Sequence, residues 1–301
     1  MNTTKTETTG HASATRQNTL RLGPAHLTVT DLDRSIAFYE RSIGLSVRER
    51  DGTTATLWAG GDDDLLVLAA DPSARRAGRH AGLYHVALLH PSRLELARAA
   101  ARLAETRTPI IGASDHGISE AIYLPDPDGN EVELAADRPR EVWPDLSDPG
   151  WDGGPQPLDL DALLHVVAAE PVQEHADPGL TVGHLHLHVG DVERGLEFYR
   201  DLLGFDVMTR MPTAAFMAAD GYHHHVAINV WRGVGVPPAP AGTVGLRHWT
   251  IVYATQDALA ATLARLAQAG VPTETRPEGV LVRDPWGIAV LLTAAGPRMG
   301  A

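Results

Sequence analysis

The chain has 301 residues, of which 44% are hydrophobic, so it is long enough and apolar enough to build two ordinary globular domains. Its formal net charge of −13 argues against nucleic acid and anionic membranes as partners, because both would repel an acidic surface. It contains no cysteine, which excludes disulfides, thiolate zinc sites and iron–sulfur clusters. Any metal must be held by His, Asp or Glu, and 15 histidines are available. The composition therefore favours a small-molecule partner.

The first segment, residues 1–19, is polar and rich in Thr, and it has no apolar stretch of the kind found in signal peptides. It predicts a disordered tail. No run along the chain approaches the roughly 18 apolar residues that a membrane span needs. We expect a cytoplasmic protein.

Two stretches of the chain nearly superimpose. One reads HLTVTDLDRSIAFYERSIGLSV from His26, and the other reads HLHVGDVERGLEFYRDLLGFDV from His186. Each begins with alternating apolar residues, which is typical of a strand, and then changes to the apolar period of a helix. The helical pattern ends at Gly44 or Gly204, a residue type that suits a helix C-terminus.

A weaker repeat follows each of these stretches. GLYHVALLHPSRLELARAAARLAE and GLRHWTIVYATQDALAATLARLAQAG again predict a strand and an amphipathic helix, and each precedes a hairpin around DPDGN or DPWGI. The chain thus divides into four βαβββ-like modules, which begin near residues 22, 82, 182 and 245. We expect modules one and two in residues 20–137 and modules three and four in residues 180–295. The segment 138–179 is dense in Pro, Gly and Asp and predicts a linker with one short helix in LDLDALLHVV.

One motif in module two stands out because it places a histidine, a tyrosine and a glutamate around a tight turn. Its members are His116, Ile122-Tyr123, Asp126-Pro127, Gly129 and Glu133. This spacing resembles the signature of the type I extradiol catechol 2,3-dioxygenases, which are two-domain members of the vicinal oxygen chelate superfamily; Ser114, two residues before the histidine, is a mild departure. The resemblance covers the chain from about Arg21 to Thr293. It implies an α+β fold in which four βαβββ modules pair into two half-barrel domains.

The resemblance also implies a metal held by two histidines and one carboxylate, an arrangement that leaves positions open for substrate and oxygen. The first histidine position lies seven residues before the Asp that ends a module's first strand. It is His184 in module three but Pro24 in module one. The second histidine heads HVALL or HWTIV, which gives His85 in module two and His248 in module four.

The carboxylate position, seven residues after the turn Asp, is Glu133 in module two and Leu291 in module four. If the modules paired in chain order, neither pair would hold a complete set of ligands. Pairing module two with module three instead assembles His85, Glu133 and His184, and leaves modules one and four with a single histidine, His248. We therefore predict the metal site between modules two and three.

Three more residues are catalytic candidates through the same resemblance. His116 and Tyr123 correspond to the residues that hydrogen-bond the substrate, and His225 corresponds to the acid–base histidine. In the run YHHH, strand alternation predicts that His223 and His225 face inward while His224 points away. A surface histidine cluster and a buried tyrosine with a partner for its hydroxyl are the structural alternatives.

The histidines of the two repeated strands need separate interpretations. His184, His186 and His188 share one strand face, where each unsatisfied imidazole would cost about 1–3 kcal/mol. We expect His184 to bind the metal and the other two to line a cavity. For His26 and His248 we expect an ordinary hydrogen-bonded place in the core.

The function implied by the resemblance is a non-haem Fe(II)-dependent extradiol dioxygenase that cleaves the ring of a catechol-type substrate with O2. Mn(II) has overlapping ligand preferences and stays open, and a homodimer is common among such relatives. Two alternatives share the fold. A glyoxalase-like isomerase or lyase would need a fourth protein ligand where VAINVW has Asn229. A metal-free protein that binds antibiotics would need none of the three ligands.

Overall fold

The computed structural model describes residues 19–144 and 154–296. Except for Thr19, the segment expected to form a tail lies outside these residues. The chain runs through four copies of one unit, in which a strand and a helix are followed by three strands. This confirms the α+β class with four βαβββ modules.

The elements of modules one and two are β1 (Leu20–Val29), α1 (Leu32–Phe38), the π-helical turn η1 (Tyr39–Ile43), β2 (Ser46–Asp51), β3 (Thr54–Trp58), β4 (Asp64–Ala70), β5 (Gly82–His90), α2 (Arg93–Glu105), β6 (Gly112–Asp115), β7 (Ser119–Pro125) and β8 (Glu131–Asp137). Between the halves lie the 3₁₀ turn η2 (Arg140–Val142), β9 (Gln156–Pro157) and α3 (Leu160–His165). The elements of modules three and four are β10 (Thr181–His188), α4 (Val192–Leu196), the π-helical turn η3 (Glu197–Leu202), β11 (Asp206–Met211), β12 (Ala214–Ala218), β13 (Val226–Asn229), β14 (Gly245–Tyr253), α5 (Gln256–Gln268), β15 (Thr273–Arg276), β16 (Gly279–Arg283) and β17 (Ala289–Ala294).

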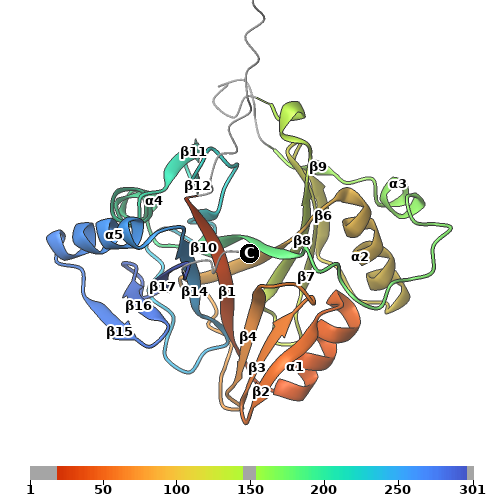
Figure 1. Cartoon of the computed structure of the whole chain (residues 1–301), viewed down its shortest axis with the longest axis horizontal. Coiled ribbons are helices and arrows are strands. Elements are labelled where there is room, and N and C mark those ends of the chain that lie inside the picture. The colour runs from red at the N-terminus through yellow and green to blue at the C-terminus, as the bar shows by residue number, and fades with distance from the viewer. Residues whose placement is uncertain (1–18, 145–153, 297–301) are drawn as a thin grey trace, which may run out of the picture.

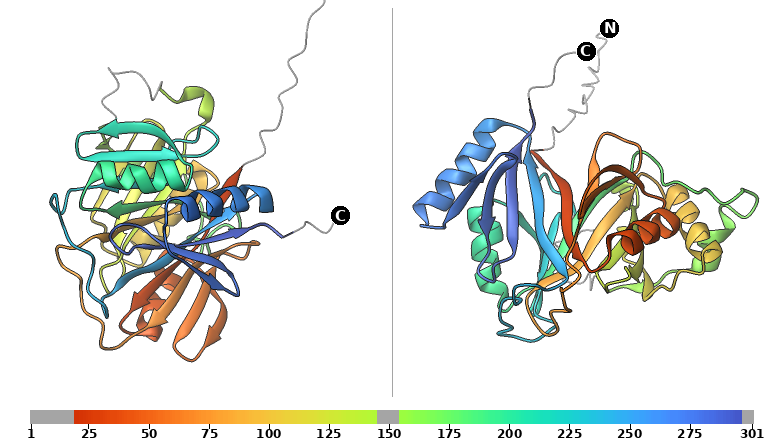
Figure 2. Two further views of the ribbon diagram at one scale, coloured as in Figure 1. Left: turned by 90° about the vertical axis from the view of Figure 1, so that its left-hand side faces the viewer. Right: turned by 90° about the horizontal axis from the view of Figure 1, so that it is seen from below.

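The modules pair across the chain rather than in chain order. One sheet has eight strands in the order β15-β16-β17-β14-β1-β4-β3-β2, which joins module four to module one. The other has nine strands in the order β11-β12-β13-β10-β5-β8-β7-β6-β9, which joins module three to module two. Figure 2 shows the red N-terminal strand β1 beside the blue strands of module four.

The helices cover the outer faces of the sheets, while the first strands of the modules meet at the centre of the molecule (Figure 1). Helix α1 contacts β3 and β4, and α2 contacts β5 and β8. In each sheet the two central strands are antiparallel, β1 with β14 and β10 with β5. Strand β1 also contacts β10, so the main hydrophobic core is continuous through both sheets.

The repeated sequence DxxRS or DxxRG is a helix start. The carboxylates of Asp31 and Asp191 each accept a hydrogen bond from the backbone N–H three residues later, at 3.0 and 2.9 Å, which satisfies an N–H that the helix leaves without a partner. The helical segment of module one ends at Gly44, whose φ of +83° is favourable only for glycine. Gly204, with φ +89°, takes the same conformation in module three. The predicted helix ends are confirmed.

A tyrosine and an aspartate tie the two sheets together twice. The Tyr39 hydroxyl of module one donates to the turn carboxylate of Asp126 in module two, at 3.3 Å. The Tyr199 hydroxyl of module three donates to Asp284 in module four, at 3.0 Å. Because modules one and four form one sheet and modules two and three form the other, each bond links one sheet to the other.

The linker contains the predicted short helix, α3, and its residues 145–153 lie outside the described part of the chain. Strand β9 within it adds to the edge of the nine-stranded sheet beside β6, a pairing that its two exposed residues gave no reason to predict. None of the described helices has the length and apolarity required to cross a lipid bilayer.

Asp284 generates a prediction about stability and pH. Burial raises its pKa to about 6, against the opposing hydrogen bonds from Tyr199 and the turn backbone. The folded state therefore binds this proton more tightly than the unfolded state, whose aspartate titrates at its ordinary value of 3.8. The contribution of the neutral Asp284 carboxyl to the free energy of unfolding is therefore lost as the pH rises from about 4 through 6, by about 2–3 kcal/mol in total.

The variant Asp284→Asn lacks this titration. We expect the free energy of unfolding of the natural protein, measured in urea, to fall relative to that of Asp284→Asn between pH 4 and pH 7. A constant difference between the two proteins over that range would contradict the assignment.

Candidate metal centre

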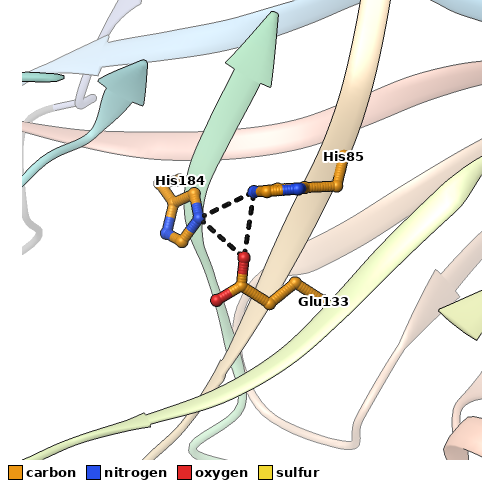
Figure 3. A group of neighbouring side chains, drawn as sticks. All are labelled: His85, Glu133 and His184. Atoms are coloured by element: carbon orange, nitrogen blue, oxygen red, sulfur yellow. Dashed lines mark hydrogen bonds and ion pairs between the residues drawn. The ribbon is translucent and has the colours of Figure 1, made fainter. Parts of the chain in front are cut away.

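Three side chains from three adjacent strands of the nine-stranded sheet point toward one another (Figure 3). They are His85 on β5, Glu133 on β8 and His184 on β10, and they are only 4%, 3% and 4% exposed. His184 lies 99 residues from His85 in sequence. The ladder between β5 and β10 brings them together, and it exists only because module two pairs with module three.

The strand registers explain how the three groups converge. Ala87 on β5 lies opposite Glu133 on one side and opposite His184 on the other. The His85 side chain emerges two residues earlier on the same face of β5. Because the side chain of Ala87 is a single methyl group, the longer side chains on both sides can lean over it and meet. A small residue at this position is part of the site, although its type carries no signal in the sequence.

The three converging atoms are spaced like ligands of one ion. His85 Nε2 lies 2.9 Å from Glu133 Oε2, His184 Nε2 lies 3.1 Å from the same oxygen, and the two nitrogens are 3.3 Å apart. With ligand bonds of about 2.1 Å, neighbouring ligands are about 3.0 Å apart on an octahedral ion and about 3.4 Å apart on a tetrahedral ion. The triangle fits one face of an octahedron, which leaves the opposite face free.

The electrostatics of the triangle also suit a cation. Burial alone would raise the pKa of Glu133, but the neighbouring imidazoles of His184 and His85 outweigh it and hold that pKa well below its usual range. Glu133 is thus a carboxylate in a site with almost no access to water. A buried carboxylate needs a positive partner, because removing an ion from water costs several kcal/mol. A divalent ion among these three groups would supply that partner, with the imidazole nitrogens of His85 and His184 as its other donors.

The corresponding face of the eight-stranded sheet does not assemble a ligand set. Pro24 and Leu291 occupy the positions of His184 and Glu133, and His248 stacks on His26 with ring centroids 3.8 Å apart. Both rings line a cavity of about 510 Å³. Burial lowers the pKa of His26 to about 3 and that of His248 to about 4, so both are neutral at physiological pH. Within the described residues, His85, Glu133 and His184 are the one group of three potential ligands close enough to share an ion.

The predicted pair His116 and Tyr123 lies beside the metal centre. His116 Nε2 and the Tyr123 hydroxyl are 2.9 Å apart. Tyr123 is the neighbour of Glu133 across the β7–β8 ladder, and its ring centroid is 5.6 Å from that of His85. Burial and the Glu133 carboxylate raise the pKa of Tyr123, so its hydroxyl stays protonated. Burial lowers the pKa of His116, so this imidazole stays neutral.

The other two histidines of β10 are held by one amide. Asn229 Nδ2 donates to His186 Nε2 at 2.9 Å, and His188 Nδ1 donates to Asn229 Oδ1 at 2.8 Å. Burial lowers the pKa of both imidazoles, which makes them uncharged hydrogen-bonded groups at the side of the site. Their place along a cavity stays a prediction.

The orientation predicted for the histidine run 223–225 is wrong for two of its members. His224, which was expected to point away, lies over the ligand His184 with ring centroids 4.1 Å apart. His225 instead stacks near Tyr222 at 4.9 Å and lines a separate cavity. The reason is that β13 begins only at Val226, so the three histidines belong to a loop in which strand alternation does not apply.

Two further aromatic residues at the site escaped the sequence analysis. Tyr84 precedes His85 and should face the opposite side of β5, yet its ring lies 4.8 Å from His85 and 5.0 Å from His186. A register irregularity in the β10–β5 ladder at this point turns it onto the same face. Trp231 packs on Tyr84 at 5.5 Å, edge to face. The residue pattern of β5 does not reveal this break in strand alternation, so the sequence could not predict the position of Tyr84.

Comparison with known proteins relates this centre to a family. The family model described as the Glyoxalase/Bleomycin resistance protein/Dioxygenase superfamily matches residues 21–134 and again residues 181–292. The chain belongs to this superfamily. Among its members, the catechol-2,3-dioxygenase of Bacillus subtilis (strain 168) is 39% identical over 269 residues, which are 88% of this chain and 93% of that protein. A biphenyl-2,3-diol 1,2-dioxygenase 3 of Rhodococcus globerulus is 30% identical over 116 residues, which are 37% of this chain and 61% of that protein.

Solved structures of the superfamily show the same fold. A putative dioxygenase from Bacillus subtilis subsp. subtilis str. 168 superimposes with a TM-score of 0.64 at 13% identity, covering 91% of this chain and 86% of that one. Glyoxalase I from Zea mays gives a TM-score of 0.59 at 19% identity, covering 92% of this chain and 93% of that one. At these identities the likeness concerns the arrangement of the modules alone.

A pair of histidine variants tests which sheet holds the metal. We expect His184→Ala to lose the ability to bind a divalent metal, because it removes one corner of the triangle, and His248→Ala to keep it, because His248 belongs to the other sheet. Metal content per chain after loading and desalting measures both. Metal lost from His248→Ala and retained by His184→Ala would reject the site.

The role of Ala87 can be tested without changing a ligand. Ala87→Leu should weaken metal binding by about 100-fold or more, since a larger side chain fills the space over which the ligands meet. Leu88→Ala is the control on the opposite face of β5, where we expect a stability loss of about 2–5 kcal/mol with metal affinity retained. Equal metal affinity in Ala87→Leu and the natural protein would show that the methyl group is irrelevant.

Proposed function

We propose that this protein is a non-haem Fe(II)-dependent extradiol dioxygenase that cleaves a catechol-type ring with O2. The single observation that carries the proposal is the buried triangle of His85, Glu133 and His184, whose spacing fits one face of an octahedral ion. The 39% identity over 88% of the chain to a catechol-2,3-dioxygenase supports the choice of reaction. When bound, Fe(II) offers open positions for a diol and O2 and allows electrons to pass between them.

Around the metal, the chain supplies groups that orient the substrate and handle its protons. Tyr123 keeps its proton and, paired with His116, is a fixed hydrogen-bond donor or acceptor for a substrate hydroxyl. The Tyr84 ring beside His85 and His186 offers an apolar aromatic surface to a flat ring. His224 beside His184, rather than His225, has the position for accepting a proton from a hydroxyl at the metal.

The alternatives are less well supported. A glyoxalase-like isomerase or lyase would place a fourth protein ligand near Asn229, but the Asn229 amide is already engaged by His186 and His188. The structural likeness to glyoxalase I reflects the fold. A metal-free binding protein gives no reason for a buried carboxylate between two imidazoles, which is costly without a cation.

The proposed reaction has a direct test. Protein loaded anaerobically with Fe(II) should consume one O2 per catechol and, with ¹⁸O2, place both labelled atoms in a ring-opened product. Cleavage beside the diol rather than between its carbons identifies the extradiol reaction and is read from the product's NMR spectrum. Loading with Mn(II) in parallel compares the two metals. No oxygen uptake by iron-loaded protein, with catechol or with a substituted catechol, would end the proposal.

The role of Tyr123 can be separated from substrate binding. We expect Tyr123→Phe to lower kcat by about 10²–10³-fold, since an oriented hydroxyl at a reacting group has effects of that size, while iron content stays at that of the natural protein. Tyr253→Phe is a matched control, because the Tyr253 hydroxyl is bonded to the Leu203 carbonyl in the core of the eight-stranded half. An unchanged kcat in Tyr123→Phe would remove the residue from the mechanism.

A further inference from the structure

A chain of three hydrogen-bonded side chains leads from the end of β8 to the metal centre. Asp137 Oδ1 accepts from His223 Nε2 at 2.9 Å. His223 Nδ1 and His224 Nδ1 are 2.8 Å apart, and the His224 ring lies over His184. Asp137 comes from module two and the two histidines come from module three, so the chain crosses the interface that creates the metal site.

The chemistry of these groups fixes the donor and the acceptor in each of the two hydrogen bonds. A carboxylate has acceptor atoms only, so His223 must carry its proton on Nε2, which leaves Nδ1 of a neutral imidazole without a proton. His224 must then donate from its own Nδ1. The remaining nitrogen of His224, Nε2, then carries no proton and keeps its electron pair free.

We propose that Asp137 is a positioning residue: acting through His223, it holds His224 in the tautomer whose Nε2 carries a free electron pair and accepts a hydrogen bond from a substrate hydroxyl at the metal centre. This inference rests on the proposed function for its consequence in catalysis, but the tautomer of His224 follows from the hydrogen bonds alone. A third group that orients a histidine base through its other nitrogen is a general device in enzymes.

The surroundings of His223 keep it neutral and fixed. It is 4% exposed, and burial lowers its pKa although the Asp137 carboxylate acts in the opposite direction. The Tyr222 ring covers it with centroids 4.0 Å apart, and the Trp143 ring lies 5.3 Å away. Tyr222 also donates its hydroxyl to Asp137 Oδ2 at 2.8 Å, which holds the carboxylate from its other side. Because His223 is neutral and held in place, its hydrogen bond to Asp137 determines which of its nitrogens faces His224 without a proton.

The variant Asp137→Asn tests this series of hydrogen bonds because its amide can donate to His223 Nε2. That donation would reverse both tautomers and put the proton of His224 on Nε2. We expect kcat with catechol to fall by about 10²–10⁴-fold, as when a histidine base is held in the wrong tautomer, with KM changed less than threefold and iron content unchanged.

The matched control is Glu120→Gln, on β7 of the same module. Glu120 is a buried carboxylate paired with Arg93 and Arg138, so the variant removes one buried charge without touching the histidines. It should lose stability and keep both kcat and the natural tautomers.

Nitrogen NMR of ¹⁵N-histidine-labelled full-length protein, loaded with diamagnetic Zn(II), reads the tautomers independently of activity. We expect His223 protonated on Nε2 and His224 on Nδ1 in the natural protein, and the reverse in Asp137→Asn. The proposal is overturned if Asp137→Asn retains the natural tautomers, or if these reverse and kcat stays within threefold. If the natural protein shows the expected tautomers but no ring cleavage, the dioxygenase proposal fails and the tautomer assignment stands.

Discussion

The antiparallel ladder between β5 and β10 is the interaction on which the site depends. It joins the first strand of module two to the first strand of module three, and it sets His184 opposite Ala87, whose other neighbour is Glu133. Shifting this ladder by one residue would turn His184 to the other face of the sheet and dissolve the triangle. The metal site is therefore a property of the register between β5 and β10.

Modules one and two follow each other in the chain but belong to different sheets, as do modules three and four. Contacts between the sheets must therefore hold each of these pairs together. Two equivalent contacts contribute to this, Tyr39 with Asp126 and Tyr199 with Asp284. Each aspartate also holds the backbone of its own turn, so one side chain shapes a hairpin and anchors it to the neighbouring sheet. The repeated motifs that look alike in sequence thus serve the assembly of the fold in both halves.

The two sheets differ where chemistry is concerned. In one, two imidazoles and a carboxylate meet within 3.3 Å and need a cation to balance the buried charge. In the other, Pro24 and Leu291 stand at the positions of His184 and Glu133, so no carboxylate is present there. His26 and His248 are neutral and stack on each other. The same backbone accommodates both outcomes, because a ligand set depends on a few side chains while the fold depends on the apolar pattern of all the strands.

The sequence by itself determined the four modules and their repeats, and its resemblance to a known family pointed to the three ligands and to the pairing of modules two and three. The modules follow from periodicity, and the ligands follow from the positions at which the family's histidine or carboxylate is present or missing; both are local properties of the chain. Tertiary structure alone decided which member of the histidine run 223–225 reaches the metal centre, because that run precedes β13 and obeys no strand rule. It also decided the place of Tyr84 and the bond from Asp137 to His223, since a register irregularity and a contact between residues 86 apart depend on how modules pack, not on what any one segment prefers.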